Sequence, residues 1–121
     1  MPGFIQMKAR WKNAHRKPGT MNKMEAAYSD HLAARKLAGE ILDYRFEALK
    51  FRLADNTTLT PDFIVLMPDG LIEAHDVKGS FFPEHNRVKW KVAVDQYPWF
   101  SWVLVRKQAL KRGGGFEYER F

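Results

Sequence analysis

The sequence predicts an α/β domain in which helices flank a mixed central sheet. Three observations support this prediction. A capped helical segment comes early, two apolar runs joined by a turn lie near the centre, and a second helical segment precedes a nearly continuous apolar run. The expected order is a helix, three antiparallel strands, a second helix and a further strand. A chain of 121 residues with 45% apolar content suffices for one such domain with its own core.

The first helix is expected over residues 25–42. Asn22 is a capping residue and Glu25 follows three positions later, which is the pattern of a capping box. The segment is rich in Ala, Leu, Arg, Lys and Glu, all of which favour helices. The residues expected to face the core recur at helical spacing and are Met24, Ala27, Tyr28, Ala34, Ala38 and Ile41.

A three-stranded antiparallel meander is expected to follow this helix. Tyr44 to Leu53 is predicted to form its first strand, and Asp55-Asn56 a tight turn into Thr58–Thr60. The next two apolar runs, 63–67 and 71–77, are then predicted to pair as a hairpin.

The turn of this hairpin decides which side chains share a face. Its Pro-Asp-Gly sequence favours a turn, because Pro presets φ and Gly accepts a positive φ. A three-residue loop ending in a left-handed glycine places Asp62 directly opposite Asp76, and Lys78 shares the face of Asp76. A two-residue loop would instead pair Asp62 with Val77 and turn the Asp62 side chain away.

The second half of the chain is expected to add a helix and two strands. The helix is predicted over Glu84 to Gln96, and Pro98 limits its continuation. Phe100 to Val105 is typical of a strand covered on both faces. Gly113 to Gly115 is expected to be a flexible break before a short final strand at Phe116 to Phe121. Residues expected to pack in the core are Val88, Val92 and Val94 of the helix and, in preference to stacking on an unpaired base, Trp90, Trp99 and Trp102.

Asp62, Asp76 and Lys78 are the candidate chemical groups. Two adjacent carboxylates suit a hard cation such as Mg²⁺, and the backbone carbonyl of Val77 would add another oxygen. Lys78 would hold or help to deprotonate an attacking water and place positive charge against a phosphate. In the alternative interpretation, Asp62 only begins a strand, Asp76 pairs with a surface base and Lys78 is solvated. Strands disfavour Asp and buried charge is costly, which favours a function for the group as a whole.

Three nearby polar side chains are expected to lie outside this site. His75 and Glu73 alternate with Asp76 along the strand, so they are predicted to point to the opposite face. His31 on the first helix is likewise expected to be structural.

Pro61-Asp62, a hairpin and then Asp76-Val77-Lys78 resemble the signature of the PD-(D/E)XK nuclease superfamily. The expected order of elements from Asn22 to Lys107 also resembles that superfamily's restriction-endonuclease-like core. The resemblance implies Mg²⁺ as cofactor, with Mn²⁺ as a substitute, and a glutamate on the first helix that completes the metal site. Glu25 is the matching position, and its alternative role is that of the capping box.

Within that superfamily, the chain resembles small phage nucleases of the endonuclease I or Holliday-junction resolvase kind. This resemblance implies a metal-dependent endonuclease for DNA, branched DNA in particular, in a phage or bacterial cytoplasm. Such relatives usually act as homodimers, because two symmetric strands must be cut. The alternatives are a non-catalytic DNA-binding module of the same fold, or a nuclease for RNA, single strands or mismatched duplexes.

The positive charge of the chain is concentrated at its start. Residues 1–21 are expected to be a basic flexible arm, followed by a single nuclease domain at 22–121. The net charge of +6 equals that of the basic residues Lys8, Arg10, Lys12, Arg16, Lys17 and Lys23, because the rest of the chain is balanced. Such an arm suits a phosphate backbone. The alternative is a disordered tail that aids solubility.

A second basic group is expected on the second helix. Arg87 and Lys91 are four residues apart and share a face, whereas Lys89 lies nearly opposite, so at most two of the three are predicted to contact phosphates. Ordinary surface lysines are the alternative. The chain has no cysteine, which excludes disulfides and thiolate chemistry. It also has no long apolar run or secretory leader, so no membrane partner is expected.

Overall fold

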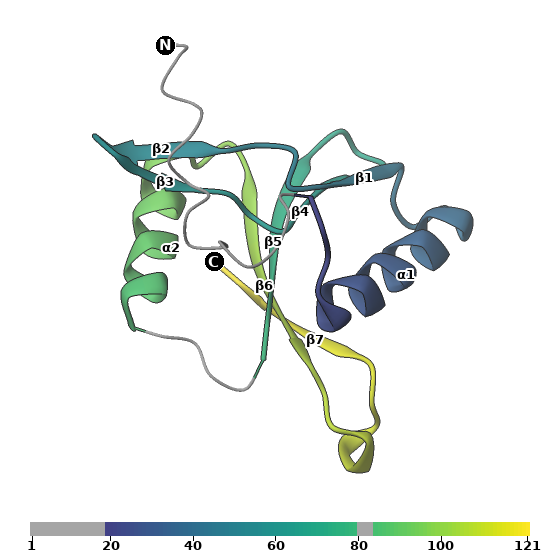
Figure 1. Ribbon diagram of the computed structural model, residues 1–121. Helices are drawn as coiled ribbons and strands as arrows, with labels where there is room; N and C mark the ends of the chain where they lie inside the picture. The colour runs from purple at the N-terminus through teal and green to yellow at the C-terminus, as the bar shows by residue number, and fades with distance from the viewer. Residues whose placement is uncertain (1–18, 80–83) are drawn as a thin grey trace.

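The computed structural model describes residues 19–79 and 84–121 and has an α/β fold (Figure 1). Five strands form one mixed sheet in the order β1-β4-β5-β6-β7, while β2 and β3 form a separate two-stranded sheet. The predicted arm lies mostly outside the described residues. The elements are α1 (Lys23–Leu37), β1 (Asp43–Phe46), β2 (Phe51–Ala54), β3 (Thr57–Leu59), β4 (Phe63–Leu66), β5 (Ile72–Lys78), α2 (Glu84–Gln96), β6 (Ser101–Lys107), a 3₁₀ turn (Leu110–Arg112) and β7 (Phe116–Arg120).

The first helix begins as predicted and ends earlier. Its capping box is present: the Glu25 amide donates to the Asn22 side chain at 2.7 Å, and the Asn22 amide donates to the Glu25 carboxylate at 2.9 Å. The helix ends at Leu37, because Gly39 has a φ of 79° and turns the chain away.

The predicted core residues of the first helical segment are confirmed in part, since Tyr28 and Ile41 are buried and Met24 packs against the core. Glu25, Tyr28 and Leu32 are buried, whereas Ala34 and Ala38 are exposed. The prediction failed at these two alanines, because alanine favours a helix at every position and therefore does not mark the face that packs. The helix packs instead through the row that contains Tyr28 and Leu32, which are four residues apart.

The predicted meander is confirmed in its antiparallel pairing and wrong in the continuity of its first strand. Glu47 has a φ of 50°, which interrupts the expected long strand and divides it into β1 and β2. β1 pairs antiparallel with β4 in the central sheet, and β2 pairs antiparallel with β3 across the predicted turn at Asp55-Asn56, so the two predicted arms pair in two separate pieces. The short β2–β3 hairpin is therefore an insertion that packs its apolar side chains with Trp90 and Ala93 of α2, namely Phe51, Leu53 and Leu59.

The hairpin of β4 and β5 has the register that brings the two aspartates together. The Met67 amide donates to the Leu71 carbonyl at 2.9 Å, which closes a three-residue loop. Gly70, the last residue of this loop, has a φ of 90°. The paired residues place Asp62 opposite Asp76, as the three-residue loop predicted. The two-residue alternative is wrong.

Gly70 is expected to be important for this register. An alanine there meets no atom within 4 Å, so its cost is the strain of a positive φ rather than a clash. Gly70→Ala should lower the free energy of unfolding by about 1–2 kcal/mol. Gly70→Asn is the matched control and should cost less, because asparagine tolerates the left-handed region. Urea unfolding of the three proteins measures this difference, and equal costs for both variants would contradict the interpretation.

The two helices cover opposite sides of the central sheet (Figure 1). β6 lies parallel to β5, and its residues Trp102 to Val105 are buried, which confirms a strand covered on both faces. The core position of Trp90 and Trp102 is also confirmed. Val88 and Trp99 are exposed, contrary to prediction, because Val88 lies two residues from Trp90 on the helix and Trp99 lies in the turn after it.

The final strand is confirmed as β7, which pairs antiparallel with β6. The predicted break at Gly113 to Gly115 is a hydrogen-bonded turn between these strands, in which all three glycines have positive φ.

Candidate active site

The candidate site lies where β4 begins and β5 ends. The Asp62 amide donates to Oδ1 of Asp76 at 2.9 Å, and the Val77 amide donates to Oδ2 of Asp62 at 2.8 Å. Each carboxylate is thus held by the backbone of the neighbouring strand. The convergence of the two aspartates is therefore a consequence of the hairpin register.

Lys78 completes the group. Its Nζ lies 2.8 Å from Oδ2 of Asp76, and its side chain retains only 20% of its exposure. Asp76 is buried. Lys78 is therefore not a solvated surface residue, and the basic partner of Asp76 is part of the same site.

Glu25 reaches the site from α1. The first turn of α1 lies near the end of β5, where a side chain at Gly79 would contact the Met24 methyl at 3.9 Å. Glu25 is buried, and its charge acts on both Asp62 and Lys78. The capping role is confirmed by its contact with the Asn22 amide. The same carboxylate is also near enough to the aspartates to contribute to their electrostatic environment.

The site contains more negative than positive groups. Burial raises the pKa of Asp62 well above its ordinary value, and the Asp76 and Glu25 carboxylates raise it further. Burial alone would lower the pKa of Lys78, but Asp76, followed by Asp62 and Glu25, raises it above its ordinary value. Lys78 is therefore an ammonium at neutral pH, and one cation faces three carboxyl groups.

Three carboxyl groups beside one ammonium leave negative charge that a divalent cation would neutralise. Carboxylate oxygens are hard donors, and a divalent cation would relieve the repulsion that raises the pKa of Asp62. In residues 19–79 and 84–121, no three acidic or histidine side chains already form a set of metal ligands. Mg²⁺ keeps several waters and usually takes only one or two carboxylates, so the Asp62–Asp76 pair fits such an ion. The role of the Val77 carbonyl stays a prediction.

A separate polar network lies on the other face of β5. The Tyr28 hydroxyl lies 2.7 Å from Nδ1 of His75, and Nε2 of His75 lies 2.8 Å from the Glu73 carboxylate. Arg120 donates to the second oxygen of Glu73 at 3.0 Å. Burial lowers the pKa of His75, so the ring is neutral; Nε2–H donates to Glu73, and Nδ1 accepts from Tyr28.

This network confirms that His75 and Glu73 lie outside the candidate site. His31 contacts the Tyr118 hydroxyl at 3.0 Å, which agrees with a structural role. The contribution of Tyr28 and Arg120 was missed by sequence reasoning, because they lie far from Glu73 in the chain and their alignment depends on tertiary packing.

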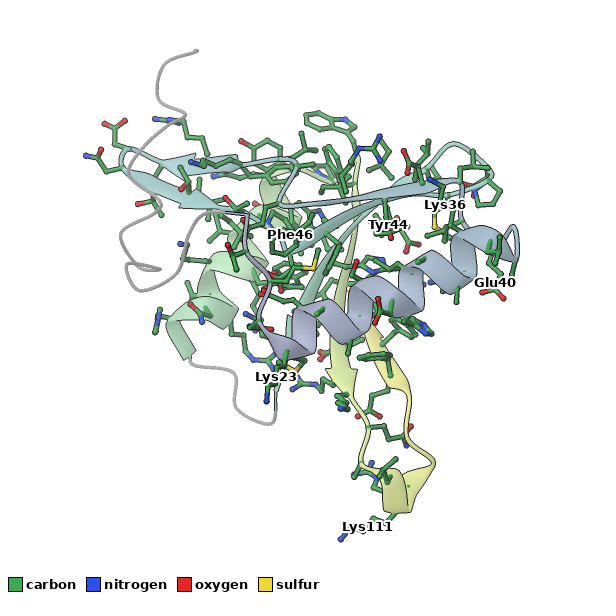
Figure 2. The ribbon with its side chains drawn as sticks, turned by 45° about the vertical axis from the view of Figure 1, so that its right-hand side comes forward. Lys23, Lys36, Glu40, Tyr44, Phe46 and Lys111 are labelled. Carbon is green, nitrogen blue, oxygen red and sulfur yellow. The ribbon has the colours of Figure 1, made fainter. Side chains whose placement is uncertain are left out.

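The predicted basic residues are distributed over several elements. Lys23 is exposed in the first turn of α1, which also carries Glu25 (Figure 2). On α2, Lys91 is exposed and Arg87 and Lys89 are half-buried. The other predicted phosphate contacts lie outside the described residues, at Lys8, Arg10, Lys12, Arg16 and Lys17. Contact of any of these residues with DNA stays a prediction.

The function of the site has to be inferred from its own geometry. Neither helix among the described residues is long and apolar enough to cross a bilayer. No family model, curated protein or solved structure matches this chain.

Proposed function

We propose that this protein is a metal-dependent endonuclease of the PD-(D/E)XK kind that hydrolyses phosphodiester bonds in DNA. The observation that carries the proposal is the group of Asp62, Asp76 and Lys78, in which Asp76 is buried and the other two are half-buried, held together by two carboxylate–amide hydrogen bonds and one ion pair. The chain order also supports it, since α1, the antiparallel strands β1, β4 and β5, then α2 and the parallel β6 agree with a restriction-endonuclease-like core. The β2–β3 hairpin is then an insertion and β7 an addition.

The carboxylates and Lys78 have different roles in this proposal. Asp62, Asp76 and Glu25, with the Val77 carbonyl, would hold Mg²⁺ or Mn²⁺. When bound, the cation supplies a water of lowered pKa and positive charge at the phosphate. The two aspartates are positioned before substrate arrives, because backbone amides already hold their oxygens.

Lys78 acts as a charged donor rather than as a base. Its raised pKa keeps it protonated at neutral pH, so it cannot remove a proton from water in that state. As an ammonium, Lys78 orients the attacking water or neutralises a phosphate oxygen as negative charge develops in the transition state.

We propose branched DNA as the preferred substrate, in a phage or bacterial cytoplasm, with a homodimer as the active form. This part of the proposal is supported by the resemblance to resolvase-like nucleases and by the basic start of the chain. A non-catalytic DNA-binding module is the second candidate, because the aspartates are already partnered by amides and Lys78 without a metal.

The proposal is tested by incubating the purified protein with a four-way junction, a linear duplex and single-stranded DNA in Mg²⁺, Mn²⁺ or EDTA. Cleavage is expected in either metal, none in EDTA, and the fastest rate on the junction. Asp76→Asn should remove cleavage, whereas Asp95→Asn, which changes an exposed aspartate on α2, should not. Binding of all three substrates without cleavage in either metal would favour the binding module, and cleavage that survives in Asp76→Asn would exclude this site.

A further inference from the structure

The β6–β7 hairpin leaves the sheet at the same end as the candidate site. β6 is parallel to β5, and Arg106 pairs with Lys78, the last residue of β5. The chain then continues through Lys107 into the turn before β7 (Figure 1). Figure 2 shows Lys111 at the far end of this projection, well away from Lys36 and Glu40 at the other end of the molecule. We refer to residues 107–115 as the hairpin tip.

The hairpin tip has a defined shape. The Gln108 amide donates to the Gly115 carbonyl at 2.9 Å, and the amides of Arg112 and Gly114 donate to the Ala109 carbonyl at 2.9 and 3.0 Å. Beyond Lys107 the chain leaves the strand and forms the 3₁₀ turn at Leu110–Arg112. The tip is therefore an ordered projection at the end of the sheet where the candidate site lies.

The side chains of the hairpin tip are basic around one exposed leucine. The tip contains Lys107, Lys111 and Arg112 and no acidic residue. Leu110 is 90% exposed, and its Cδ2 lies 3.4 Å from the point where a Cβ at Gly114 would be. A single exposed leucine needs no explanation by itself. Here, however, the exposed leucine lies on a hydrogen-bonded turn, has cationic neighbours in the chain and is at the same end of the sheet as the candidate site.

We infer that the hairpin tip binds the duplex next to the cleaved phosphate. Lys107, Lys111 and Arg112 contact backbone phosphates, and Leu110 packs against sugars and base edges in the minor groove, where apolar side chains can act as wedges. This inference rests on the proposed function for the identity of its ligand.

The composition of the tip favours duplex over single-stranded DNA. Proteins that bind single strands without sequence preference stack the bases on aromatic side chains. Residues 107–115 contain no aromatic residue. A hydrogen-bonded cationic turn suits instead the regular phosphate spacing of a duplex.

Two variants of the full-length chain test this inference. Lys111→Gln/Arg112→Gln removes two cations, and Leu110→Ser removes the apolar contact. The matched control is Lys36→Gln/Arg45→Gln, which removes the same charge from two residues that contact Asp43, at the opposite end of β4 from Asp62. Affinity for a fluorescent 24-base-pair duplex (roughly two helical turns) is measured in EDTA by anisotropy over a range of salt concentrations.

The double variant is expected to bind about tenfold more weakly, and its slope of log affinity against log salt should fall by about 2, roughly one for each phosphate that the variant no longer neutralises. Leu110→Ser should weaken binding about threefold or more without changing that slope. The control should retain wild-type affinity and slope. All variants should keep the wild-type melting temperature, because the changed side chains are exposed.

The outcomes separate this inference from the proposed function. Loss of binding in the tip variants supports the inference even if the wild-type protein cuts no DNA in any metal. Cleavage by the wild type together with unchanged affinity and slope in the tip variants overturns the inference but not the nuclease. Absence of duplex binding by the wild type also overturns it. The inference is also overturned if the tip variants weaken binding to vesicles that contain phosphatidylserine but leave the affinity for the duplex unchanged.

Discussion

Replacing Asp62 by Asn is expected to remove cleavage and, at the same time, to stabilise the metal-free protein. Asp62 is half-buried beside Asp76, and its pKa is raised by desolvation and then by the Asp76 and Glu25 carboxylates. At neutral pH its ionised form therefore opposes folding, and the neutral amide removes that opposition. Cleavage should fall at least about 10²-fold, because an oxygen ligand and its charge are lost.

The sign of this effect predicts its pH dependence. Because the pKa of Asp62 is higher in the folded than in the unfolded protein, the carboxyl group destabilises the fold at pH values above its folded pKa. Below the unfolded value of 3.8, both states are protonated and the group makes no difference. The gain in melting temperature from Asp62→Asn should therefore be largest near pH 8 and should vanish towards pH 4.

Thermal unfolding in EDTA measures this gain. Each kcal/mol corresponds to about 3–6 °C for a domain of this size. Asp95→Asn is the control, since Asp95 is exposed, and should leave the melting temperature unchanged. Added Mg²⁺ should stabilise the wild type, because a ligand that binds only the folded state raises stability. It should not stabilise Asp62→Asn, which lacks one of the proposed carboxylate ligands. A variant less stable than wild type at pH 8 would contradict the electrostatic account.

Replacing Lys78 by Met should lower both cleavage and stability. Lys78 is the ion-pair partner of Asp76 at 2.8 Å, and its side chain is mostly buried. Without its ammonium, three carboxyl groups face one another with less compensation. The free energy of unfolding in EDTA should fall by about 1–3 kcal/mol. Cleavage should fall about 10²–10³-fold, which is typical when a donor to developing charge is removed.

Asp62→Asn and Lys78→Met are expected to change stability in opposite directions. The first removes one of the carboxylates that repel one another, and the second removes the cation that offsets them. Since the pKa of Lys78 is raised above 10.5 in the folded state, its contribution to stability is fully present below pH 10.5 and is lost as the pH rises through the folded value. Lys78→Arg, which retains the charge, should recover most of the stability and only part of the activity, because arginine has a different shape and hydration. If Lys78→Met is as stable as the wild type at pH 7, the ion pair of Lys78 with Asp76 does not offset the repulsion between the carboxylates.

Much of the site followed from local sequence because its residues lie close together in the chain. Pro-Asp-Gly favoured a turn and left a three-residue and a two-residue loop as alternatives. The structure has the three-residue loop, whose register places Asp62 opposite Asp76. The capping box at Asn22 and the bounds of α2 were also predictable, since capping and helical periodicity are local interactions.

The outer parts of the fold depended on contacts between distant segments. Nothing in Tyr44 to Leu53 itself marked Glu47 as the break that separates β1 from β2. The apolar residues of β2 and β3 suit either strands continuous with the central sheet or a separate hairpin. In the structure they form the separate hairpin and pack against α2.

The sequence by itself determined the hairpin and the three candidate residues, and it reduced the register to two alternatives, of which the structure has the one that brings these residues together. Tertiary structure decided that Glu25 lies near enough to change their electrostatics and that Tyr28 and Glu73 hold His75 on the opposite face. It also decided that a basic tip projects beside the site, through the parallel pairing of β5 with β6. A turn specifies only its own neighbours, whereas charge and position at a site depend on every element packed around it.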